Sequence, residues 1–370
     1  MLRLPTYEDL SKEQQHIFDL TLDESHLVTG PPGSGKTVMA IYRAEMLHRT
    51  RKEPTLLLMY GRLLSRYSAA AVKSLRIESI VRNYHSWFRD WFKDTYDRLP
   101  PRDGRYGFYW QECFRLIMQS PPPPKLRPHL IVDEGQDMPK EFYAVLRMIA
   151  RTMTVFADEN QQLTDDRSTV SEIRAATGIT CTAHLTRNFR NTRAIAAVAA
   201  AFYTGAGAGP VELRDDALDG DPPVLDCDKT LYATVTRLVN FEKANSRQQI
   251  GVLVPYTKQL TALYNRLQGK TRNPVQIYLS TDMGPRKPID FTKPGIKLVS
   301  YVSAKGLEFD TAFLPELQAN RADPHSLSFR MSMYVMTSRA RSGLYFVYSG
   351  EGEPAVVSTL PLDLIEDWRD

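Results

Sequence analysis

The sequence predicts an α/β protein built from two domains in tandem, each with a parallel β-sheet. Short apolar runs of strand length alternate with helical patterns, and this alternation occurs twice along the 370 residues. The length suffices for two domains of ordinary size. With 42% hydrophobic and 24% charged residues, the composition excludes a disordered or fibrous protein.

The first domain is predicted over residues 1–178 and the second over residues 179–370. In the first, strands are expected at 25–29, 55–60, 130–133 and 154–157, and helices at 36–49, 63–71 and 140–151. In the second, strands are expected at 250–254, 275–279, 297–301 and 344–348, and helices at 192–203, 231–244, 258–267 and 329–338. Strands that alternate with helices in this way favour a parallel sheet with helices on both faces.

Charge and cysteine content restrict the class of protein only broadly. The net charge of +4 is too small to identify a polyanionic partner, although residues 41–90 hold ten basic against four acidic residues. Three cysteines without a close pair indicate neither a zinc site nor a disulfide framework. No signal peptide or membrane-spanning run is evident, so we expect a cytoplasmic protein with no membrane partner.

The strongest local motif is GPPGSGKT, at the point where an apolar strand turns into a helix. It fits the phosphate-binding pattern G-x-x-x-x-G-K-[ST], in which backbone N–H groups and the helix N-terminus face one anion. Lys36 adds a charge for the outer phosphates, and the Thr37 hydroxyl can bind Mg²⁺. The predicted nucleotide-binding residues here are Gly30, Pro31, Pro32, Gly33, Ser34, Gly35, Lys36 and Thr37.

A second motif, HLIVDEGQD, is an apolar strand that ends at two adjacent carboxylates. Asp133 is expected to hold Mg²⁺, and Glu134 to orient and deprotonate the attacking water, a division of roles that phosphoryl transfer needs. Taken alone, such a strand end more often only reaches solvent. The GKT segment upstream favours the catalytic interpretation.

Together with GKT, the DEGQD segment resembles motif II of superfamily 1 helicases of the UvrD/Rep type, and further segments resemble the family's other motifs in order. The resemblance implies two RecA-like P-loop domains that bind MgATP in the cleft between them. It assigns adenine recognition to Gln14 in LSKEQ, phosphate sensing to Gln161 in ADENQ, and a γ-phosphate contact to Arg190 in LTRNFR. It places Glu308 of SAKGLEF at the ribose and makes Arg339 of YVMTSRAR an arginine finger supplied in cis.

The nucleic-acid contacts implied by the resemblance lie within the basic stretch. TLLLMYGRLL and NYHSW resemble family segments that line a single-strand channel, which gives Tyr60, Arg62, Tyr84, His85 and Trp87 as candidates. Aromatic rings in a positive groove bind single strands by stacking and phosphate neutralisation. The alternative is an amphipathic helix packed on the core, which we favour for Phe88, Trp91 and Phe92, and His85 is equally compatible with a structural role.

The sequence departs from the family's pattern in the parts that couple nucleic-acid binding to ATP hydrolysis. The chain is too short for the family's large accessory subdomains, Val302 replaces the usual histidine before motif V, and no aromatic pair follows Gln161. The resemblance nevertheless implies an ATP-dependent single-strand translocase or helicase, with DNA as the expected strand and 3′ to 5′ polarity. The alternative is a regulatory or sensor ATPase subunit that binds nucleic acid or a partner protein, such as a nuclease or repair factor, without processive unwinding.

Overall fold

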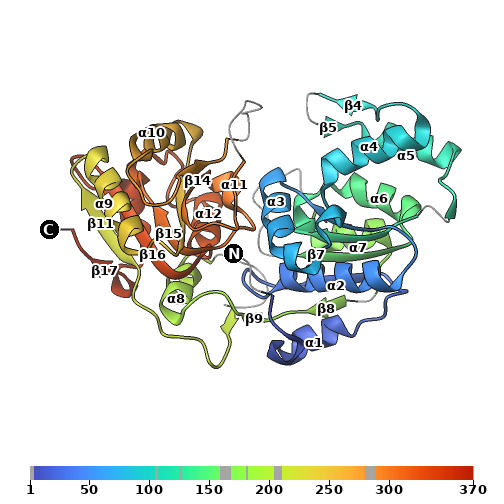
Figure 1. The fold of residues 1–370 in the computed structure, drawn as a ribbon, viewed down its shortest axis with the longest axis horizontal. Coiled ribbons are helices and arrows are strands. Elements are labelled where there is room, and N and C mark those ends of the chain that lie inside the picture. Colours follow the sequence, from blue (N-terminus) through green and yellow to red (C-terminus); the bar gives the residue numbers. More distant parts are fainter. Residues whose placement is uncertain are drawn as a thin grey trace. The chain divides into compact units, whose positions relative to one another are not determined.

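The computed structural model describes residues 4–104, 107–124, 127–158, 168–180, 182–203, 211–279 and 288–369. The chain divides into an N-terminal unit that ends at Thr186 and a C-terminal unit that begins at Arg187. Each unit has its own parallel sheet with helices packed against it (Figure 1). The predicted fold class, α/β with two parallel sheets in tandem, is confirmed.

The N-terminal sheet has six parallel strands in the order β3-β2-β6-β7-β1-β8. Its strands are β1 (His26–Thr29), β2 (Thr55–Met59), β3 (Val81–Asn83), β6 (His129–Asp133), β7 (Thr152–Ala157) and β8 (Thr182–His184). The helices are α1 (Lys12–Phe18), α2 (Lys36–Thr50), α3 (Arg62–Ala71), α4 (Tyr84–Tyr96), α5 (Trp110–Gln119), α6 (Lys140–Ile149) and α7 (Val170–Thr177). A small antiparallel hairpin, β4 (Arg102–Asp103) and β5 (Gly107–Phe108), lies between α4 and α5 in sequence.

This strand order positions the candidate site. The phosphate-binding loop follows β1, Asp133 ends β6, Asp158 follows β7, and all three strands are parallel neighbours. The ends of parallel strands meet at one edge of the sheet, which is where open α/β sheets bind their ligands. Because β8 pairs with β1, the N-terminal unit extends to Thr186, past the residue 178 at which the sequence prediction placed the boundary.

The core of the N-terminal unit is rich in aromatic residues. Phe88 and Phe92 of α4 are fully buried and pack with Phe142 of α6, whereas Trp91 is only partly buried. Residues 84–96 therefore form the amphipathic helix that the sequence analysis gave as an alternative for this segment.

The C-terminal sheet has seven parallel strands in the order β13-β14-β12-β15-β16-β11-β17. They are β11 (Val224–Asp228), β12 (Gln249–Val254), β13 (Gln276–Ile277), β14 (Gly295–Ser300), β15 (Phe309–Leu314), β16 (Ala340–Ser349) and β17 (Glu366–Asp367). The helices are α8 (Arg193–Ala201), α9 (Leu231–Ala244), α10 (Thr257–Leu267), α11 (Tyr301–Ala304) and α12 (Leu327–Thr337), and a separate parallel pair joins β9 (Arg187–Asn188) to β10 (Glu212–Leu213).

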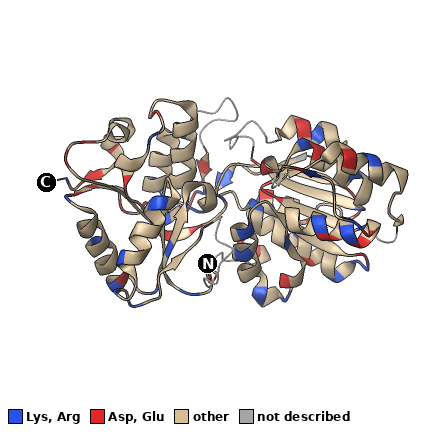
Figure 2. Cartoon of the chain, turned by 90° about the horizontal axis from the view of Figure 1, so that it is seen from above, with Lys and Arg blue, Asp and Glu red and all other residues tan. Residues whose placement is uncertain are grey.

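Charged residues of both signs are interspersed over the two units (Figure 2), in keeping with the small net charge. None of the helices in the described part of the chain is both long and apolar enough to cross a lipid bilayer.

Candidate nucleotide site

The phosphate-binding loop is shaped by two glycines in left-handed backbone conformations, Gly33 (φ 82°) and Gly35 (φ 89°). Helix α2 begins directly after the loop, at Lys36. A Cβ atom at Gly35 would lie 2.5 Å from Nε2 of Gln14, so both the conformation and the packing favour glycine there. The Ser34 hydroxyl donates to the Pro31 carbonyl, which tightens the turn.

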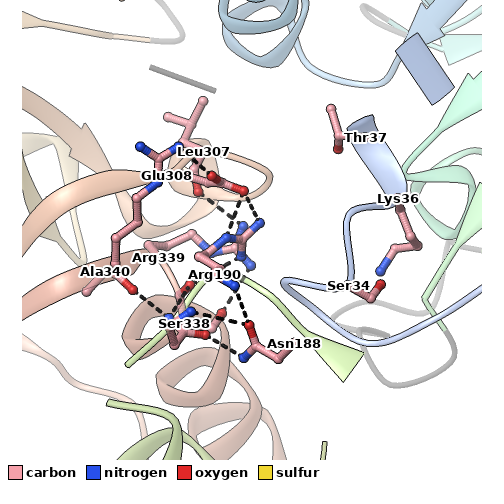
Figure 3. Close-up of polar contacts among 12 residues, drawn as sticks. Ser34, Lys36, Thr37, Asn188, Arg190, Leu307, Glu308, Ser338, Arg339 and Ala340 are labelled. Carbon is pink, nitrogen blue, oxygen red and sulfur yellow. Dashed lines mark hydrogen bonds and ion pairs between the residues drawn. The ribbon is translucent and has the colours of Figure 1, made fainter. Parts of the chain in front are cut away.

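The Lys36 ammonium lies over its own loop (Figure 3). Its Nζ donates to the carbonyl oxygens of Gly30 at 2.5 Å and Pro31 at 2.8 Å, and it lies 3.6 Å from a carboxylate oxygen of Asp158. Two of its three partners are therefore neutral main-chain groups. A phosphate oxygen would offer a stronger, charge-assisted bond to the same ammonium.

Thr37 and Asp133, the two residues predicted to bind Mg²⁺, contact each other. The Thr37 hydroxyl donates to Oδ2 of Asp133 at 2.8 Å, and Asp133 is 1% exposed at the end of β6. Its other oxygen, Oδ1, is buried without a hydrogen-bond partner. Burial, and then the charge of Glu134, raise the pKa of Asp133 to about 7.

These two residues fit a Mg²⁺ ion. A buried carboxylate oxygen that lacks a partner and an adjacent hydroxyl are the ligand types that this ion takes from proteins, which leave its other positions to phosphate and water. Among the described residues, no group of three or more His, Cys, Asp or Glu forms a complete metal cage.

Glu134 is held in place by a neighbour that the sequence analysis did not single out. Its backbone is left-handed (φ 52°), an uncommon conformation for a side chain of this size. Gln136 donates to its carboxylate at 2.6 Å and accepts from the backbone N–H of Asp158 at 2.9 Å. Gln136 thus ties the end of β6 to the end of β7. Gln136 is part of the DEGQD segment, but no local sequence pattern shows that its side chain bridges two strands.

Gln14 contacts the loop from α1. It is 5% exposed, accepts from the Ser11 N–H at 3.1 Å and donates to the Ser34 carbonyl at 3.1 Å. Both ends of its carboxamide are engaged within the N-terminal unit, so recognition of adenine by Gln14 stays a prediction. Gln161, the predicted phosphate sensor, lies outside the described residues.

In the C-terminal unit, Arg190 and Glu308 belong to one ion-pair cluster (Figure 3). Nε of Arg190 donates to Oε1 of Glu308 at 2.8 Å, and Nη2 of Arg341 donates to Oε2 at 2.8 Å. Phe309 and Ala340 are register partners at the start of β15 and β16, which brings Glu308 beside Arg341. Burial alone would raise the pKa of Glu308, but the two arginines lower it to about 2.

Arg339 has different surroundings. It is 1% exposed, and its guanidinium donates to the carbonyls of Val335 and Leu307 and to the hydroxyl of Ser338. These bonds join the end of α12 to the segment that carries Glu308. Its role as an arginine finger stays a prediction, while Arg341, which the sequence analysis missed, shares Glu308 with Arg190.

The five candidate nucleic-acid residues are unequal in exposure. Tyr60 is 41% exposed and stacks on Tyr84, with ring centroids 5.6 Å apart, at the ends of the neighbouring strands β2 and β3. Arg62 begins α3 and is exposed. His85 stacks on Phe108 at 4.3 Å.

Trp87 is 8% exposed and belongs to the hydrophobic core. Its ring faces the interior because residues 84–96 form an amphipathic helix. The structure therefore removes Trp87 from the set of rings available to stack on bases.

Residues 14–165 match a protein-family model described as an AAA domain, which supports the P-loop and nucleotide use predicted for the N-terminal unit. No curated protein matches the sequence. Among solved structures, the chain is similar to the C-terminal domain of a possible DNA helicase from Lactobacillus plantarum WCFS1, at 20% identity and a TM-score of 0.36, over 48% of this chain and 98% of that one.

Two viral helicase structures are also similar. The helicase nonstructural protein 10 of an arterivirus matches at 14% identity and a TM-score of 0.41, over 95% of this chain and 64% of that one. The helicase of PRRSV matches at 15% identity and a TM-score of 0.38, over 90% of this chain and 54% of that one. At these identities and TM-scores the likenesses assign no activity to this chain.

Proposed function

We propose that this protein hydrolyses MgATP and uses the energy to move along a single strand of nucleic acid, with DNA as the expected strand. The observation that carries the proposal is the arrangement at the edge of the N-terminal sheet. There, Lys36 lies over a phosphate-binding loop, Thr37 bonds to a buried Asp133, and Glu134 follows directly.

Each of these side chains has a task in phosphoryl transfer. Lys36 is placed to exchange its two loop carbonyls for phosphate oxygens, and Thr37 and Asp133 would hold Mg²⁺. A Mg²⁺ ion held by these two residues would supply positive charge to the phosphates. Glu134, oriented by Gln136, accepts the proton of the attacking water.

The C-terminal unit is proposed to supply positive charge to the transferred phosphoryl group. Charge on its equatorial oxygens is stabilised by arginines, and a finger of this kind raises turnover by roughly 10³ to 10⁵. The resemblance assigns a γ-phosphate contact to Arg190 and the role of the finger to Arg339. Because Arg339 is only 1% exposed, whereas the side chain of Arg341 is 20% exposed, Arg341 is a second candidate for the finger.

For the nucleic-acid contact, Tyr60 and Arg62 are the strongest candidates. An exposed ring backed by a second ring gives a stacking surface without sequence preference, and an exposed arginine gives phosphate neutralisation. Movement from 3′ to 5′, and unwinding of duplex ahead of the protein, follow from the family resemblance.

Strand displacement tests the proposal. The purified chain would be given duplex DNA with a 3′ or a 5′ single-stranded tail, with ATP and Mg²⁺, and release of the labelled strand would be measured. Displacement from the 3′-tailed duplex alone is expected. Displacement from the 5′-tailed duplex alone would contradict the polarity.

The second candidate function is a regulatory or sensor ATPase subunit. It is favoured by the burial of Trp87 and by the lack of an aromatic pair after Gln161, both of which reduce the surface that can stack on bases. For this function, ATP turnover without displacement from either duplex is expected. Processive displacement by the isolated chain would exclude it.

A further inference from the structure

A hollow of about 690 Å³ lies in the C-terminal unit, on the face of the sheet covered by α9. Its volume is in the range of small-ligand pockets. None of its lining residues belongs to the candidate nucleotide or nucleic-acid sites. They include Asp228, Tyr232, Arg237, Phe241, Phe313, Tyr345 and Trp368.

The hollow has an aromatic wall. Phe313 and Tyr345 are register partners on β15 and β16, and their rings stack with centroids 4.4 Å apart and planes 7° apart. Phe241 of α9 packs edge-on against Tyr345 at 5.4 Å. Tyr232 and Trp368 are 70% and 45% exposed and complete the lining. Several rings are thus gathered around one opening.

Two buried carboxylates lie beside this aromatic wall. Asp226 and Asp228 lie on one face of β11, two residues apart, and Arg237 of α9 binds both. Its Nη1 lies 2.6 Å from Oδ2 of Asp226, and its Nη2 lies 3.1 Å from Oδ1 of Asp228. The remaining oxygen of Asp228, Oδ2, is buried and has no hydrogen-bond partner, although the residue is only 5% exposed.

The charges around the hollow are mainly negative. After burial, Asp221 raises the pKa of the Tyr345 hydroxyl, Arg237 lowers it and Glu366 raises it, so two carboxylates and one arginine lie near this group. Arg237 is shared between two carboxylates, and Lys270 lies over the Tyr232 ring at 5.8 Å. A phosphate would be repelled by this surplus of carboxylates, whereas a cation would be attracted.

We propose that this hollow binds the guanidinium group of an arginine side chain presented by a partner polypeptide. A guanidinium is flat enough to lie against the aromatic wall, and its N–H groups can donate to the unsatisfied oxygen of Asp228. Arg237 already makes such bonds to the same two carboxylates from within the chain. The site is independent of the proposed ATPase function.

Peptide titration of the full chain tests this proposal. The ligand would be acetyl-Gly-Arg-Gly-amide, and the matched neutral ligand would carry citrulline, which keeps the shape of arginine without its charge. Binding would be followed by tryptophan fluorescence. The variant Trp368→Phe identifies the signal, since it keeps an aromatic ring in the hollow while the chain's other three tryptophans remain.

We expect half-saturation at or below about 10 mM arginine peptide, with the citrulline peptide at least about tenfold weaker. Asp228→Asn is expected to abolish this preference. Tyr232→Ala, at a side chain 70% exposed, is expected to weaken binding several-fold without loss of the fold. ATP turnover should be unchanged in both variants.

Three results would overturn the proposal. They are equal binding of the two peptides, an arginine-dependent signal that survives in Trp368→Phe, and the absence of any saturable binding. Displacement of the arginine peptide by a thymidine dinucleotide would likewise overturn it, in favour of a nucleotide ligand.

Discussion

The phosphate-binding loop of the N-terminal unit and the arginine cluster of the C-terminal unit hold their cations in opposite ways. Lys36 is bonded to two neutral carbonyls and lies farther, at 3.6 Å, from the Asp158 carboxylate. Arg190 and Arg341 both bond directly to the Glu308 carboxylate. Bonds to a carboxylate are stronger than bonds to a neutral carbonyl. We therefore expect the loop to determine nucleotide binding, and the release of arginines from Glu308 to determine turnover.

The largest effect is expected for Lys36→Ala. Removal of the ammonium leaves the outer phosphates without their positive partner, so ATP binding or hydrolysis should fall to background in a steady-state assay. Lys140→Ala is the matched control, because Lys140 forms an exposed ion pair with Glu172 in the same unit. Near-normal hydrolysis by Lys36→Ala would refute the assignment of the phosphate site.

The arginine cluster is tested by Arg339→Ala beside Arg341→Ala. Arg339→Ala should leave ATP affinity within a few-fold and lower turnover by roughly 10³ or more. It should also lower the melting temperature, because its bonds to Val335 and Leu307 are buried. If only stability changes in Arg339→Ala while Arg341→Ala lowers turnover, the finger is Arg341.

The variant Glu134→Gln separates nucleotide binding from ATP hydrolysis in the N-terminal unit. The amide cannot accept the proton of the attacking water, so hydrolysis should fall by about 10²- to 10⁴-fold while nucleotide binding persists. Fluorescent nucleotide titration and single-turnover hydrolysis would measure the two steps. Glu172→Gln, on the surface of α7, is the control. Loss of nucleotide binding would make Glu134 a structural residue or a metal ligand.

A smaller effect is expected at the stacked tyrosines. Tyr60→Ala removes one stacking ring, so the concentration of single-stranded DNA needed for half-maximal ATPase stimulation should rise roughly 5- to 100-fold. Tyr109→Ala, at a ring 51% exposed, is the control. Trp87→Ala should instead lower thermal stability, because the ring is in the core. Unchanged DNA dependence in Tyr60→Ala would remove this residue from the strand contact.

The smallest effect is expected for the pH dependence of thermal stability in Glu308→Gln. A carboxyl with its pKa lowered to about 2 in the folded state contributes stability that is present above its ordinary pKa of 4.5 and lost as the pH falls through 2. The contribution is at most about 3 kcal/mol. Glu308→Gln should therefore lower the melting temperature at pH 7, and this difference should shrink between pH 4.5 and pH 2. A difference that does not change with pH would contradict the ion-pair account.

Local patterns predicted much of the fold and of the loop. The strand before Gly30 and the helix from Lys36 were predictable. The spacing of apolar residues and the glycine-rich turn are both patterns among a few neighbouring residues. Strand β15 (Phe309–Leu314) was not predicted, because Asp310 and Thr311 interrupt the apolar run of FDTAFL.

Contacts between distant residues could not be predicted in this way. The bridge from Gln136 to Asp158 and the pairing of Glu308 with Arg341 depend on strand neighbours, which no local pattern specifies. Trp87 shows a related ambiguity. An aromatic residue in an amphipathic helix fits a core and a stacking surface equally well until the packing is known.

The most direct test of the account is steady-state ATP hydrolysis by the purified chain at low salt, without nucleic acid and with single-stranded DNA, duplex DNA or RNA. Lys36→Ala measured in parallel would show that the activity belongs to this site. The account predicts Lys36-dependent hydrolysis that single-stranded DNA strongly stimulates. Hydrolysis that no nucleic acid changes would contradict the translocase and favour a subunit activated by a protein.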